Sequence, residues 1–111
     1  MFKVINIDGK SMPMKSNGAT LRIYRETFKR DFLGDLFKMA KAQEGAGDMD
    51  MQFLEDIAWT MAKTANPKIP DVKVWMQKMN DPLAIYNASE ELINMLTDSV
   101  SGTKQSKKKK T

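Results

Sequence analysis

The chain opens with a segment whose apolar and polar positions suit an extended strand, in which successive side chains point to opposite faces. One face would carry Phe2, Val4 and Asn6, and the other Lys3, Ile5 and Ile7. Asp8–Gly9 follows, and both residue types tolerate the positive φ angles of a two-residue hairpin turn. Lys10–Met14 would form the return strand, in which Pro13 indicates an edge. We therefore predict an N-terminal β-hairpin.

The spacing of apolar residues then changes to that of helices. Ser16–Asn17 can cap a helix over Ala19–Lys29. Asp31 can cap a second helical segment, and Gly34 could separate the two segments. The apolar stripe of the first helix is Leu21, Tyr24 and Phe28, and the second segment carries Phe32, Leu33, Leu36, Phe37 and Met39. Glu44–Asp48 contains two glycines and is predicted to be a flexible loop.

The clearest helical pattern begins at Asp48 or Asp50 and continues to about Ala65. Its apolar face consists of Phe53, Leu54, Ile57, Ala58, Met61 and Ala65, with Trp59 at its border. Asn66–Pro67 and Pro70 should stop this helix, because proline disfavours helical conformation before it and lacks an N–H.

Shorter helices are expected after this point. Asp71 can cap one, and Asp81–Pro82 can begin another because proline fits the first helical position. A break near Asn87 would let Asn87 or Ser89 cap a last helix, which should end at Gly102.

These patterns predict a mainly α fold: a short N-terminal β-hairpin followed by a compact bundle of about five helices. With 111 residues, the chain suits one domain over residues 1–102, and residues 103–111 should form a flexible, disordered Lys-rich tail. No apolar run approaches the roughly 20 residues of a membrane span, and no signal-peptide core is visible, so a cytoplasmic location is expected.

The residues that usually carry catalysis and metal binding are scarce. Cysteine and histidine are absent, which excludes thiolate ligands, disulfides and imidazole bases. Asp48/Asp50 lacks the later ligands of a calcium loop, while Glu55/Asp56 and Glu90/Glu91 are helical neighbours whose side chains diverge. We expect a non-enzymatic protein without cofactor or metal.

Positive charge is concentrated near the end of the chain. Residues 103–111 carry five lysines and no acid, whereas residues 43–102 carry four lysines and ten acids. The lysine run leaves open an alternative function as a small basic-tailed nucleic-acid-binding or regulatory protein. A second basic cluster, which could drive self-association with the acidic region or simply form a solvated face, consists of Arg22, Arg25, Lys29 and Arg30.

The chain has ten methionines, whose flexible side chains suit adaptable binding surfaces. Candidate partner-binding residues are Trp75, Met76, Met79, Leu92, Met95 and Leu96. The competing and preferred interpretation is that the methionines and both tryptophans fill a small core.

The order of elements and several short stretches resemble the tail assembly chaperones of long-tailed phages and prophages of Gram-positive bacteria. The residues that carry this resemblance are Asp8–Gly9, Gly18–Arg25, Asp31–Leu33, Phe53–Trp59, Ile69–Asp71 before Trp75, and Asn87–Glu91. The resemblance extends over about residues 2–100.

The resemblance implies a mainly helical chaperone that binds the tape measure protein, recruits tail tube subunits, and is absent from the mature virion. Many such proteins also have a longer form made by ribosomal frameshifting near the end of the short reading frame. Four successive lysines imply A-rich codons, so we hypothesise that Lys107, Lys108, Lys109 and Lys110 are encoded by a slippery site.

Overall fold

A computed structural model describes the backbone of residues 1–45, 47 and 49–109, and the side chains of these residues except 43 and 100–109. The chain is mainly helical with one hairpin, as predicted. The hairpin pairs β1 (Phe2–Ile7) with β2 (Lys10–Lys15). The helices in the described part are α1 (Gly18–Phe28), α2 (Phe32–Gln43), α3 (Met51–Ala65), α4 (Val72–Gln77), α5 (Ala84–Asn87) and α6 (Ser89–Lys109), six where about five were expected.

The predicted hairpin turn is confirmed. Asp8 and Gly9 have φ angles of 60° and 75°, and Ile7 pairs with Lys10 across the turn. Ile5 and Ile7 are buried while Phe2 and Val4 are exposed, so the two faces divide as the alternation predicts. Since the sheet has only two strands, Pro13 lies on an edge strand, opposite Val4.

The turn of the hairpin is fastened to a distant part of the chain. The two carboxylate oxygens of Asp8 accept hydrogen bonds from the backbone N–H groups of Asn80 and Asp81, at 2.9 and 3.1 Å. These bonds hold the pKa of Asp8 below its usual value. The loop between α4 and α5 is therefore connected to the tip of the sheet.

Three helices begin at capping side chains that were predicted from the sequence. Asn17 accepts a hydrogen bond from Ala19 N–H, Asp50 accepts one from Phe53 N–H, and Asp71 accepts one from Val74 N–H. Helix α1 ends at Lys29, whose φ of 57° is left-handed. This turn gives the break between α1 and α2 near the predicted position.

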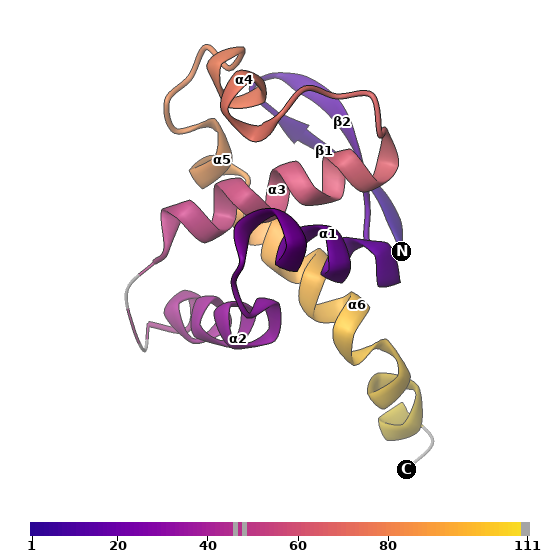
Figure 1. Ribbon diagram of the computed structural model, residues 1–111. Helices are drawn as coiled ribbons and strands as arrows, with labels where there is room; N and C mark the ends of the chain where they lie inside the picture. The colour runs from indigo at the N-terminus through magenta and orange to yellow at the C-terminus, as the bar shows by residue number, and fades with distance from the viewer. Residues whose placement is uncertain (46, 48, 110–111) are drawn as a thin grey trace.

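Helix α3 is the centre of the molecule and crosses the middle of Figure 1. The hairpin and α4 lie on one side of it and α2 on the other, while α6 runs away from it toward the C-terminal end (Figure 1). Most of its residues are buried: Phe53, Leu54, Asp56, Ile57, Ala58, Trp59, Thr60, Met61 and Ala62. Trp59, predicted at the border, is itself buried and donates its indole N–H to the carbonyl oxygen of Pro70 at 2.8 Å.

Two boundary predictions have different outcomes. The break near Asn87 is confirmed, because α5 ends at Asn87 and α6 begins at Ser89. The predicted helix end at Gly102 is wrong, because α6 continues through it to Lys109. The penalty for a glycine inside a helix is only about 1 kcal/mol, which does not force a helix to end.

The flexibility of residues 103–111 stays a prediction. No described helix is long and apolar enough to span a membrane.

Candidate functional site

Most of the predicted partner-binding residues lie in the core. Four of them are core residues with at most 7% of the side chain exposed: Trp75, Leu92, Met95 and Leu96. Met76 and Met79 are half-buried against the same core. The four buried side chains belong to the hydrophobic core in this folded form, and a role for them in partner binding stays a prediction.

The predicted self-association cluster is also divided. Arg22 pairs with Glu26 on the same helix at 3.1 Å, and Arg25 and Lys29 are exposed. Arg30 instead forms ion pairs with acidic residues of the same chain. Only the α1 part of this cluster therefore remains available to a second copy of the chain.

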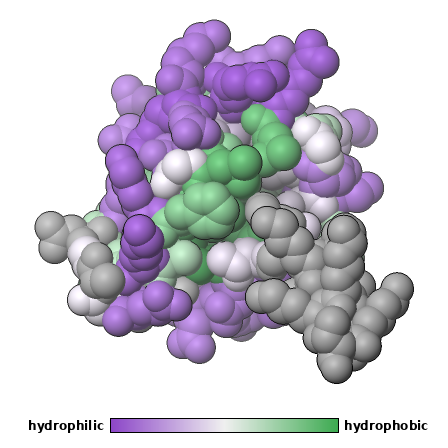
Figure 2. All heavy atoms as spheres, turned by 90° about the horizontal axis from the view of Figure 1, so that it is seen from below, coloured by the Kyte–Doolittle hydropathy of each residue, from purple (hydrophilic) through white to green (hydrophobic). Residues whose placement is uncertain are grey.

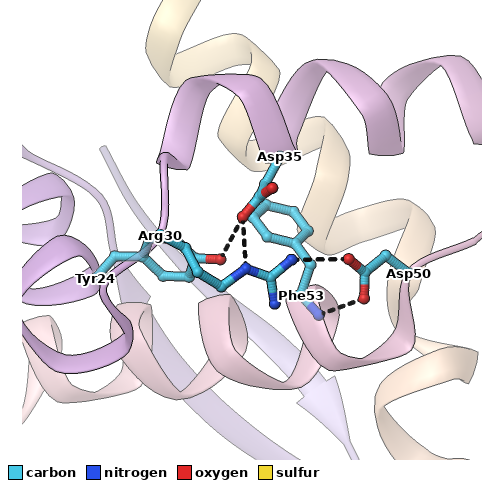
Figure 3. A network of polar contacts seen from close by, with 5 residues as sticks. All are labelled: Tyr24, Arg30, Asp35, Asp50 and Phe53. Atoms are coloured by element: carbon cyan, nitrogen blue, oxygen red, sulfur yellow. Dashed lines mark hydrogen bonds and ion pairs between the residues drawn. The ribbon is translucent and has the colours of Figure 1, made fainter.

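The internal network joins three helices and is drawn in Figure 3. The Arg30 guanidinium contacts the Asp35 carboxylate at 3.0 Å and the Asp50 carboxylate at 2.9 Å. The Tyr24 hydroxyl donates to Asp35 at 3.0 Å.

Burial, together with the hydrogen bond to Asp35, raises the pKa of Tyr24. Although burial acts to raise it, the pKa of Asp50 is held below its usual value by the N–H of Phe53 and by Arg30. These groups satisfy one another, so the network fixes α1, α2 and α3 together.

A groove lies on the surface between α2 and α6. A hollow of about 750 Å³ lies between the C-terminal half of α2, including Ala40 and Ala42, and the first turns of α6, including Ser89 and Ile93. A second hollow of about 560 Å³ lies at the other end of α2, where Leu33 approaches Asp98 and Ser99. The two helices therefore run in roughly opposite directions, and we call the two hollows together the α2–α6 groove.

Apolar side chains are exposed on α2 beside these hollows. Leu33 lines the second hollow, and Phe37 follows four residues later on the same helix; they are 43% and 55% exposed. Leu21 and Met1, which line the second hollow, are 43% and 53% exposed. Figure 2, which views the molecule from the side on which α2 lies, shows an apolar area surrounded by polar side chains. Such a patch on a small protein is typical of an interaction surface.

The apolar pattern of α2 in the sequence contains the signal for this surface. Helix α2 carries two apolar stripes: Phe32, Leu36 and Met39 are buried, whereas Leu33 and Phe37 are not. A helix at the edge of a small domain can bury only one stripe. Leu21 was predicted on the buried stripe of α1, but in the structure it is exposed because it faces the second hollow instead of α3.

The remaining candidates fall outside this surface. The side chains of Lys107–Lys110 lie outside the described residues. Among the residues that are described, no group of three or more acids could hold a metal ion. No family model, curated protein or solved structure matches the chain.

Proposed function

We propose that this protein is a tail assembly chaperone of a long-tailed phage or prophage, which acts without catalysis in the cytoplasm of the bacterial host. In this proposal it binds the tape measure protein through the α2–α6 groove, recruits tail tube subunits, and leaves before the virion is complete. The family comes from the sequence resemblance. The observation that supports a binding role is the row of exposed apolar side chains along α2.

The groove suits an amphipathic helix as its ligand. Partner helices that bind in grooves present anchors three, four and seven residues apart, a spacing that matches Leu33 and Phe37 on the receiving helix. Complete burial of an apolar side chain contributes about 1.5–3 kcal/mol. Since Phe37 and Leu33 are about half exposed, each would contribute about 1 kcal/mol when a partner covers it.

Co-expression with the tape measure protein of the same phage tests the proposal. The wild-type chain should keep this long, aggregation-prone client soluble, and Phe37→Glu should reduce the soluble fraction, because a charge would be buried at the contact. Leu83→Glu is the matched control, since Leu83 is 57% exposed and lines neither hollow of the groove. An insoluble client with the wild-type chain, or equal effects of the two variants, would refute the proposal.

The alternative of a basic-tailed nucleic-acid-binding protein depends on residues 103–111, whose side chains lie outside the described part of the chain. Its distinguishing property is a steep loss of affinity with salt, which should disappear when these residues are deleted.

A further inference from the structure

One side chain in the centre of the molecule has no visible partner. Asp56, on α3, is only 6% exposed, and its Oδ2 atom is buried without accepting a hydrogen bond from any described residue. A buried carboxylate oxygen without a donor is costly, and folded proteins seldom retain one without a reason. Asp56 is therefore the strongest unexplained polar group in the described chain.

Asp56 is a wall residue of a surface pocket. The pocket has a volume of about 580 Å³ and lies between α3 and α4. Gln52, Glu55 and Asp56 line it from α3, and Val72, Lys73 and Met76 line it from α4. It thus combines the Asp56 carboxyl group on the α3 side with the apolar side chains of Val72 and Met76 on the α4 side.

The surrounding charges leave this carboxyl unpaired. The charged and titratable groups around it are Tyr24, Arg30, Asp50, Glu55 and Lys73. Arg30 is already bonded to Asp35 and Asp50, and Lys73 forms none of the ion pairs among the described residues. Burial raises the pKa of Asp56 to about 6; Arg30 acts against this rise, while Glu55 and Asp50 add to it.

We propose that the pocket between α3 and α4 binds the cationic side chain of a lysine or arginine from a partner protein. The ammonium or guanidinium group donates hydrogen bonds to the Asp56 carboxylate, and the methylene groups of the side chain lie along Val72 and Met76. Lys and Arg side chains combine an apolar stem with a charged end, which matches the two parts of this pocket. The excess of acids over residues 43–102 favours the approach of a cationic segment.

This pocket is separate from the α2–α6 groove and would add a charged anchor to the apolar one. The assignment of a cationic ligand to this pocket rests on the proposed function only in that the cation belongs to a protein partner. The test uses small probes and needs no partner, so the two proposals can fail separately.

The test is an NMR titration of the full chain with Nα-acetyl-arginine N-methylamide and the corresponding lysine compound. The methyl signals of Val72 and Met76 should shift saturably, and Asp56→Asn should weaken binding at least tenfold. Glu91→Gln removes the same charge from an exposed position on α6 outside the pocket; it is the matched control and should change affinity less than threefold. No saturable shift, or equal affinity for wild type and Asp56→Asn, would overturn the proposal, as would tighter binding of putrescine, which would indicate a free polyamine site.

A second measurement separates binding from a structural role. Saturation with the arginine compound should lower the pKa of Asp56 by at least one unit, which corresponds to an affinity about fivefold weaker at pH 5 than at pH 7.5. An unchanged pKa would overturn the proposal. The same holds if Lys73→Ala alone raises the pKa by a unit or more, because Lys73 would then already be the partner of Asp56.

Discussion

The buried carboxyl of Asp56 should make the stability of the fold depend on pH in an unusual direction. Burial raises its pKa from the usual value of 3.8 to about 6 in the folded chain. Between these two values the folded state binds more protons than the unfolded state, so the stability contributed by this group falls as pH rises. Most paired carboxylates act in the opposite direction.

The magnitude follows from the two pKa values. Ionised Asp56 should cost the folded state about 3 kcal/mol at pH 7.5 and about 1 kcal/mol at pH 4.5, and almost nothing at pH 3. Asparagine has nearly the same shape and does not ionise. The advantage of Asp56→Asn over the wild type should therefore be about 2 kcal/mol larger at pH 7.5 than at pH 4.5.

Urea denaturation of both proteins at the two pH values measures this difference. Every other titrating group is shared by the two chains, so its contribution cancels when they are compared at one pH. Glu91→Gln serves as the control, because Glu91 is exposed on α6 and is not among the groups that act on Asp56; its difference from the wild type should change by less than about 0.5 kcal/mol. The assignment of Asp56 as a buried, unpaired acid is refuted if the difference in unfolding free energy between the wild type and Asp56→Asn is constant with pH. It is also refuted if the advantage of Asp56→Asn is larger at pH 4.5.

Three further predictions concern the fold and are all measurable by urea denaturation at pH 7.5. Leu92→Ala should destabilise the protein by about 2–5 kcal/mol because Leu92 is fully buried, whereas Phe37→Ala should cost under about 1 kcal/mol; similar losses would contradict the assignment of core and surface. Gly9→Ala should cost about 1–2 kcal/mol because the φ of Gly9 is 75°, and Gly18→Ala, at an ordinary φ with open space around it, should not. Arg30→Met should cost about 1–3 kcal/mol by removing the charged donor from two carboxylates, and an unchanged midpoint would refute that role.

Much of the fold could be predicted because its signals are local. The Asp8–Gly9 turn and the caps at Asp50 and Asp71 act through backbone groups within a few residues. The period of the apolar residues in α3 likewise identifies a helix without knowledge of its neighbours. These features depend on steric preferences that any chain with the same short segment would share.

The surface features could not be predicted in the same way, because each depends on which elements meet. The spacing of Leu92 is the same whether its face meets α3 or solvent. Sequence likewise does not reveal that Arg30 would meet Asp50, twenty residues later, or that the Glu55/Asp56 pair would divide into a half-exposed and a buried acid. Periodicity defines the faces of a helix, but tertiary packing decides which face is covered.

The bond between Asp8 and the loop at Asn80 has a consequence for how the chain folds. The hairpin closes locally, but its tip is held by residues more than seventy positions away, and its inner face is covered by α3. During synthesis, residues 1–15 leave the ribosome before Asn80 has been added to the chain. The side chains of Ile5 and Ile7 are therefore exposed to solvent during this interval. A protein proposed to guard another from aggregation would thus pass through an aggregation-prone interval of its own, which ends only when α4 and α5 have been made.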